Sequence, residues 1–155
     1  MASAAARGEQ ESPTETAIGS PPIHVGRFHF EVERALALFE DGHHDEAVRK
    51  ASQRFINRVQ GWVNRPDLDG VALINKVFSS DAPLLIFNDR STPIERDEHD
   101  GYRYLAVGLA SALRNVVTHH DDYGLDHEAA WEWLVFISAM HRRLDQAEQV
   151  TEHSA

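Results

Sequence analysis

Cysteine is absent from the chain, and this absence excludes several classes of protein at once. Without a thiol there is no disulfide, no cysteine–zinc site and no thiol nucleophile. No apolar run approaches the roughly 18 residues of a membrane-spanning helix. The first residues, MASAAARGEQESPTETAIGSPP, also lack the apolar core of a secretory signal. We therefore expect a cytoplasmic protein that does not bind a membrane.

Basic residues are scarce as well. Lys and Arg number 15 against 25 Asp and Glu, which gives a formal net charge of −10. This charge opposes broad, nonspecific binding to nucleic acid or to an anionic membrane. Any contact with a phosphate group would therefore have to be local. The length of 155 residues allows one domain of ordinary size.

Periodic apolar residues begin after an irregular start. We expect residues 1–22 to form a disordered N-terminal tail, residues 23–150 one folded domain and residues 151–155 a C-terminal tail. Helical spacing predicts a first helix near 25–41, which stops at Gly42, and a second in HHDEAVRKASQRFINRVQGWVNRP, which a proline closes. The short turn between them predicts antiparallel packing.

The middle of the chain is less regular. DLDGVALINKVFS predicts one short helix, whereas residues 80–101, rich in Pro, Asp, Asn and Ser, predict a long connecting loop. Helical spacing resumes in EHDGYRYLAVGLASALRNVVTHH and again in DHEAAWEWLVFISAMHRRLDQAEQV, where Asp126 is the expected N-cap. No stretch predicts a strand. The expected fold class is all-α, an antiparallel four-helix bundle with an extra short helix and the long loop.

Ten histidines make metal binding a chemistry to weigh. The runs GHHDE and THHDD both bring imidazole and carboxylate groups together. Adjacent histidines on a helix point about 100° apart, however, and the paired Glu-x-x-His motifs of di-iron bundles are missing. We therefore expect neither a metal nor another cofactor, and interpret His43 and His44 as solvated residues at a helix end.

Arg114, Asn115 and His119 are the candidate catalytic residues. On a helix Asn115 and His119 are four residues apart and share a face, which Arg114 flanks. In RNA cleavage a histidine can move a proton and a guanidinium can stabilise the charge that develops at phosphorus. His120 is the alternative base. Histidine is also common at helix C-termini because of the helix dipole, so the spacing alone leaves both interpretations open.

The run ALRNVVTH resembles the signature of the HEPN superfamily, whose helical bundles carry Arg, a polar residue and then His on a late helix. Four further segments, LFEDGHHDEAVRKASQRFINRVQ, DLDGVALINKVFS, GYRYLAVGLASALRN and FISAMHRRLDQA, together resemble the bacterial Ymh family of hypothetical proteins, usually placed within HEPN. The resemblance covers roughly residues 27–147. The chain departs from the family pattern at Val116, where that pattern has a proline directly after Arg-Asn.

This resemblance implies a metal-independent endoribonuclease with Arg114, Asn115 and His119 as its catalytic residues. HEPN ribonucleases place two such motifs across a homodimer interface, and members of the superfamily commonly serve as toxins or as effectors of phage defence. Arg103 is a candidate for binding neighbouring phosphates of the RNA substrate. The alternative is a non-catalytic helical module that binds a partner protein, such as a regulator encoded nearby. Trp133 is the aromatic residue that we expect at an interface.

Overall fold

The computed structural model describes residues 27–116 and 124–150, with side chains throughout these ranges except at residues 113–116. The elements in chain order are α1 (Phe30–Glu33), α2 (Leu36–Glu40), α3 (His44–Val63), α4 (Gly70–Val77), β1 (Leu85–Ile86), α5 (Pro93–Gly108), η1 (Leu109–Val116), α7 (His127–Asp145) and β2 (Glu148–Gln149). The described chain is mostly helical, as predicted. The expected tails, residues 1–22 and 151–155, lie outside the described residues.

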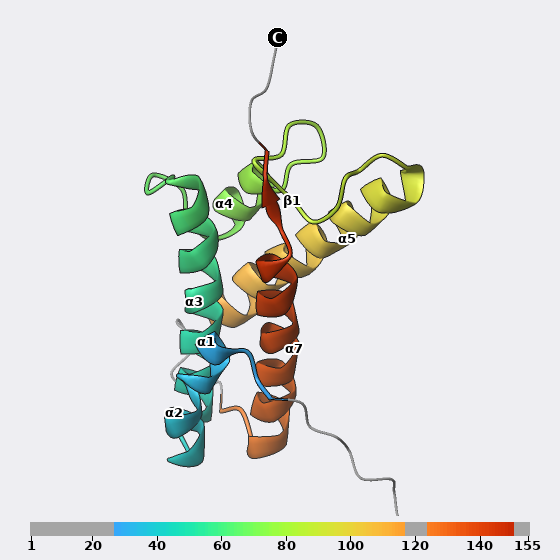
Figure 1. The fold of residues 1–155 in the computed structure, drawn as a ribbon. Coiled ribbons are helices and arrows are strands. Elements are labelled where there is room, and N and C mark those ends of the chain that lie inside the picture. Colours follow the sequence, from blue (N-terminus) through green and yellow to red (C-terminus); the bar gives the residue numbers. More distant parts are fainter. Residues whose placement is uncertain (1–26, 117–123, 151–155) are drawn as a thin grey trace, which may run out of the picture.

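The two longest helices, α3 and α7, lie side by side at the centre of the fold (Figure 1). They run in the same direction, and α5, which comes between them in the sequence, descends obliquely in this view. Each of the two buries one apolar stripe, as expected for amphipathic helices that face a core. Their largest fully buried apolar side chains are Phe55 and Ile56 on α3 and Leu134, Ile137 and Leu144 on α7.

The prediction of a single helix near residues 25–41 is wrong, because two short helices, α1 and α2, form there instead. Between them the N–H of Ala35 donates to the carbonyl of Val32 at 2.8 Å. This bond reaches only three residues back, which tightens the turn and interrupts the α-helix. Gly42 follows the end of α2, as predicted, with a φ of +83° that favours glycine.

The prediction of a loop over residues 80–101 is wrong for its second half, because α5 already begins at Pro93. The hydroxyl of Thr92 accepts a bond from the N–H of Glu95 at 3.2 Å, and the Glu95 carboxylate accepts one from the N–H of Thr92 at 3.0 Å. This reciprocal pair is a capping box, and Pro93 occupies the first helical position that suits its fixed φ. Local backbone chemistry therefore starts the helix despite the polar composition.

The expectation of no strand is also wrong. β1 and β2 form a two-stranded antiparallel pair, in which Leu85 lies opposite Gln149 and Ile86 opposite Glu148. Beside it the N–H of Val150 donates to the carbonyl of Leu84 at 2.9 Å. These bonds attach the chain after α7 to the connection between α4 and α5.

The last two long helices bracket the candidate catalytic motif. The helix predicted over residues 98–120 continues from α5 into η1, which is π-helical, and its predicted end lies outside the described residues. Asp126 caps α7 as predicted, since its carboxylate accepts a bond from the N–H of Ala129 at 2.8 Å. Among the described helices, none has both the length and the apolar character needed to cross a membrane.

Candidate functional site

The predicted catalytic residues lie at the edge of the described chain. Arg114 and Asn115 belong to η1, where the backbone is described and their side chains are not. His119 and the alternative base His120 fall within residues 117–123, outside the described residues. The structure thus gives the backbone position of half of the motif, and the catalytic roles of its residues stay predictions.

The backbone of η1 is of a rare type. A π-helix closes its hydrogen bonds five residues back instead of four, and π-helical turns recur at functional sites. The segment packs against α3, α4 and α5, with Leu109 and Ala110 buried. The rotation per residue is smaller in a π-helix than in an α-helix, so the α-helical angles between neighbouring side chains do not apply within η1.

Arg103, the candidate phosphate-binding residue, is engaged by groups of the protein. A terminal nitrogen donates to Oδ1 of Asn75 at 3.0 Å, and Nε lies 3.7 Å from Oδ1 of Asp100. Its guanidinium carbon lies 4.3 Å from the ring centroid of Tyr104, a cation–π contact. With 15% of its side chain exposed, Arg103 packs α5 against α4. Phosphate binding would have to compete with these contacts.

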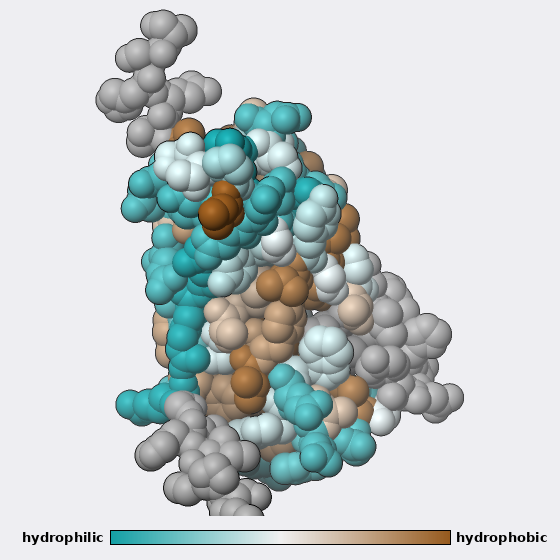
Figure 2. Space-filling model, turned by 90° about the vertical axis from the view of Figure 1, so that its right-hand side faces the viewer, coloured by the Kyte–Doolittle hydropathy of each residue, from teal (hydrophilic) through white to brown (hydrophobic). Residues whose placement is uncertain are grey.

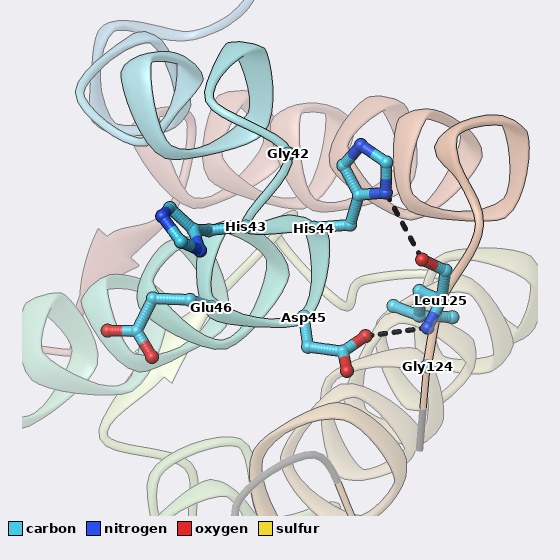
Figure 3. Close-up of a pocket in the computed structure, with 7 residues that line it drawn as sticks. All are labelled: Gly42, His43, His44, Asp45, Glu46, Gly124 and Leu125. Atoms are coloured by element: carbon cyan, nitrogen blue, oxygen red, sulfur yellow. Dashed lines mark hydrogen bonds between the residues drawn. The ribbon is translucent and has the colours of Figure 1, made fainter. Parts of the chain in front are cut away.

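A polar pocket lies at the N-terminus of α3 (Figure 3). Its lining residues are Gly42, His43, His44, Asp45, Glu46, Gly124 and Leu125. Oδ1 of Asp45 accepts a hydrogen bond from the N–H of Leu125 at 2.7 Å. Nδ1 of His44 lies 3.2 Å from the carbonyl oxygen of Leu125. Because a carbonyl oxygen only accepts, His44 carries a proton on Nδ1 and donates this bond.

The interpretation of both His43 and His44 as solvated residues is therefore wrong for His44. His43 is exposed, as expected. The ring of His44 is half-buried, with its centroid 5.1 Å from that of Phe39 and 5.6 Å from that of His127. Its partner in the hydrogen bond lies 81 residues away in the sequence, so no local pattern could have indicated the contact.

A second group of titratable side chains joins the N-terminal segment, α3 and α7. Nε2 of His29 lies 3.0 Å from Oδ2 of Asp145, and Arg58 donates to the other oxygen of Asp145 at 2.5 Å. Arg58 also donates to Nδ1 of His141 at 3.0 Å. Burial opposes the charged form of Asp145, but the hydrogen bond and charge of Arg58 outweigh it and lower the pKa of that carboxyl. Both ring nitrogens of His29 and of His141 have a partner inside the fold, which indicates a structural role.

The pKa of His141 is lowered to about 4. Burial in the core is the largest cause, and the nearby positive charge of Arg58 adds to it. His141 is therefore neutral near pH 7. Within residues 27–116 and 124–150, no group of three or more His, Asp or Glu side chains is arranged to hold a metal ion.

An apolar groove runs between α5, η1 and α7. Its lining residues are Tyr104, Leu105, Gly108, Leu109, Ala112, Trp133 and Phe136. Tyr104 and Leu105, both on α5, are 63% and 45% exposed, which leaves two large hydrophobic side chains open to solvent at this groove. Figure 2 shows apolar side chains gathered at the centre of this side of the molecule. The exposed patch marks a surface suited to association.

The chain was compared with known protein families, curated proteins and solved structures. The sequence profile of a family described as protein of unknown function (Hypoth_ymh) matches residues 27–144, which include nearly the whole helical part of the chain. Searches of curated proteins and of solved structures found no match.

Proposed function

The chain belongs to the Hypoth_ymh family, and from this membership and its Arg-Asn-x-x-x-His motif we propose that it is a metal-independent endoribonuclease of the HEPN type. In the proposed reaction a ribose 2′-hydroxyl attacks the adjacent phosphorus, which forms a 2′,3′-cyclic phosphate and releases the 5′-oxygen of the next nucleotide. His119 transfers a proton, and Arg114 stabilises the charge at phosphorus. Asn115 orients one of these groups by hydrogen bonds. The proposal assigns the helical scaffold to a HEPN-type four-helix bundle.

The observation that carries the proposal is the π-helical geometry of η1. Its last residues include Arg114 and Asn115, so a rare backbone geometry coincides with the candidate catalytic motif. π-helical turns occur frequently at functional sites. This coincidence favours a functional motif over an ordinary helix end.

The proposed active form is a homodimer. The apolar groove of α5, η1 and α7 adjoins the motif and exposes Tyr104 and Leu105. A second copy that covered this surface would bury apolar area and bring two η1 segments near one another. Two Arg114 side chains would then give a local positive charge within a chain whose formal net charge is −10. RNA bound mainly by these two groups would be held weakly and in a salt-sensitive manner.

The test is an RNA cleavage assay in EDTA with the wild-type protein and the Arg114→Ala and His119→Ala variants. Each substitution is expected to reduce the rate on the order of a hundredfold or more. If such an activity is confirmed, the role of a toxin or of an effector in phage defence becomes testable by growth arrest on expression in bacteria.

A non-catalytic module that binds a partner protein is the second candidate. The apolar groove favours it, since a groove between two helices can receive an amphipathic helix of another protein. A wild-type protein that fails to cleave RNA, together with specific binding of a helical peptide to the groove, would select this candidate.

A further inference from the structure

Residues 27–34 cross the two central helices, and we call this segment the N-terminal strap. It contains α1, which packs against both α3 and α7 (Figure 1). On α7 the hydroxyl oxygen of Ser138 accepts a bond from the N–H of His29 at 2.8 Å. On α3 the guanidinium of Arg54 donates to the carbonyl oxygen of Glu31 at 3.1 Å. Each of the two helices therefore binds the backbone of the strap.

His29 is a buried residue of the strap, and both nitrogens of its ring have fixed roles. Nδ1 accepts a bond from the N–H of Glu31 at 3.1 Å, so the neutral ring carries its hydrogen on Nε2. Nε2 lies 3.0 Å from Oδ2 of Asp145 and donates to it. One face of the ring stacks on His141, with the two centroids 4.9 Å apart. The strap thus covers one face of a buried histidine of α7.

His141, the other ring of the stack, is bound in the same manner. Its Nδ1 accepts a bond from Arg58 at 3.0 Å, and its Nε2 lies 3.3 Å from the carbonyl oxygen of Ala51. The groups that face the ring are Ala51, Phe55 and Arg58 of α3, Asp145 of α7 and His29 of the strap. The charge of Arg58 opposes a second positive charge there. The carboxylate of Asp145 is already bound by both Arg58 and His29.

A second proton on either ring conflicts with these bonds. On His141 it would place an N–H against the guanidinium of Arg58, and on His29 it would place one against the N–H of Glu31. Protonation of both rings would also stack two positive charges in a buried site. Release of the strap relieves these conflicts, because it separates the rings and brings water to each of them.

The turn between α1 and α2 is the point at which the strap can separate. The N–H of Ala35 bonds three residues back, to the carbonyl of Val32, and so interrupts the α-helix. The bonds on either side are long, at 3.3 Å from the N–H of Arg34 to the carbonyl of Phe30 and at 3.3 Å from Phe39 to Ala35. Hinges commonly lie at the ends of such elements. Separation at this turn therefore breaks few strong helical bonds.

We propose that the N-terminal strap is an acid-released element, which detaches from α3 and α7 when the stacked pair of His29 and His141 takes up a proton, while the other helices stay folded. Detachment exposes Val32, which is fully buried, and the sides of α3 and α7 that the strap covers. This surface is then open in mild acid and covered near pH 7. The inference does not depend on ribonuclease activity.

The absence of cysteine allows a direct test, since one introduced cysteine is the only thiol in the full chain. Val32→Cys places the thiol on the strap. Val77→Cys is the matched control, because Val77 is equally buried and lies on α4, which packs against α3, α5 and η1. An aromatic disulfide that reacts with thiols in mild acid labels each variant. Each rate is divided by the rate of the same variant unfolded in urea at the same pH.

We expect the thiol of Val32→Cys to become accessible before the core does. At pH 5 its corrected rate should exceed that of Val77→Cys about tenfold or more, because local opening needs less free energy than global unfolding. Between pH 7.5 and pH 5 it should rise on the order of tenfold. The reason is that burial and Arg58 hold the pKa of His141 at about 4, below its ordinary value of 6.5, so the opened form takes up a proton first.

Two histidine variants identify the group that takes up the proton. His141→Gln keeps an oxygen acceptor and an N–H donor but cannot titrate, so it should remove most of the rise at Val32→Cys. His99→Gln is the control, because His99 is fully buried on α5 and stays buried when the strap detaches. It should leave the rise at Val32→Cys unchanged and reduce the rise at Val77→Cys, where labelling needs global unfolding.

Hydrogen exchange of the unsubstituted chain gives a second measurement, which introduced thiols cannot disturb and which decides if Val32→Cys is unstable. Relative to the unfolded rate at each pH, residues 27–34 should lose protection in mild acid before α4 does. Equal corrected labelling of the two cysteine variants at pH 5, or equal loss of protection in the two segments, would show that the strap opens only with the whole protein and would overturn the proposal. A rise at Val32→Cys that His141→Gln leaves unchanged would overturn it as well.

Discussion

The imidazole rings of His29 and His141 stack in the core, with centroids 4.9 Å apart and an angle of 7° between their planes. Nδ1 of His141 accepts a bond from Arg58 at 3.0 Å, so the ring carries its hydrogen on Nε2, which lies 3.3 Å from the carbonyl oxygen of Ala51. This arrangement needs neutral His141. A second proton would place an N–H against the guanidinium of Arg58.

Stability is therefore expected to fall in mild acid. The pKa of His141 is about 4 in the folded protein, because of burial and the charge of Arg58, against 6.5 as its ordinary value. The unfolded chain then takes up a proton more readily, so the stabilisation is complete above pH 6.5 and is lost as the pH falls from there toward 4. Between pH 7.5 and pH 5 the free energy of unfolding should drop by about 2 kcal/mol from this group. Urea denaturation at the two values measures the drop.

The His141→Gln variant identifies the group responsible. It should be less stable at pH 7.5 and show a smaller drop between the two pH values. His99 is a second buried histidine whose pKa is lowered by burial, so His99→Gln is the matched control and should remove its own share of the pH dependence. An unchanged pH dependence in His141→Gln would contradict the assignment.

Thr92→Ala should destabilise the protein through the start of α5. The substitution leaves the N–H of Glu95 without its side-chain acceptor and breaks the capping box. A loss of about 1 kcal/mol in the free energy of unfolding is expected. Thr92→Ser keeps the acceptor and should lie within a few tenths of a kcal/mol of wild type. Equal stability of the Ala and Ser variants would show that the cap contributes nothing.

The capping box is a feature of the fold that could have been predicted from the sequence. Thr92, Pro93 and Glu95 stand at the spacing of a helix start, so the beginning of α5 was readable from local residues. The density of polar residues around them favoured a loop instead. The β1–β2 pair could not be read in this way, because strands of two residues have no periodicity and their partners lie far apart in the sequence.

In the candidate site, too, one part could be predicted from the sequence and another could not. The Arg-Asn-x-x-x-His motif is contiguous and can be recognised without a structure. By contrast, the contact of the chain after it is long-range, since Leu125 lies 80 residues from Asp45. No spacing rule relates such pairs. The change to π geometry in η1 likewise has no local signature in the sequence.

Dimerisation through the apolar groove predicts a specific effect of charge. Wild-type protein should scatter light as a particle of twice the 17.5 kDa chain mass at micromolar concentration. Leu105→Glu places a carboxylate in the groove and should give monomers, because a buried charge without a partner opposes association.

Ile94 supplies the control for this substitution. It is 80% exposed and lies at the start of α5, and it does not line the groove. Ile94→Glu should therefore remain dimeric. Monomeric wild-type protein at all concentrations, or equal behaviour of the two variants, would remove the support for association through this surface.

The rates of RNA cleavage by two variants can show whether His119 or His120 is the base. We expect His119→Ala to lose RNA cleavage and His120→Ala to retain most of it, because the motif assigns the proton transfer to His119 and one such group is needed. Initial rates on a labelled RNA measure both. A larger loss in His120→Ala would reassign the base to that residue and leave the general reaction in place.

The ends of the RNA products test the central claim most directly. Wild-type protein in EDTA should leave 2′,3′-cyclic phosphate ends detectable by mass spectrometry, because the 2′-hydroxyl is the nucleophile and no metal-bound water takes part. RNA methylated at every 2′-oxygen should resist cleavage, and Arg114→Ala should reduce the yield of cyclic ends on the order of a hundredfold. Products with 3′-hydroxyl ends, or cleavage that EDTA abolishes, would contradict the account.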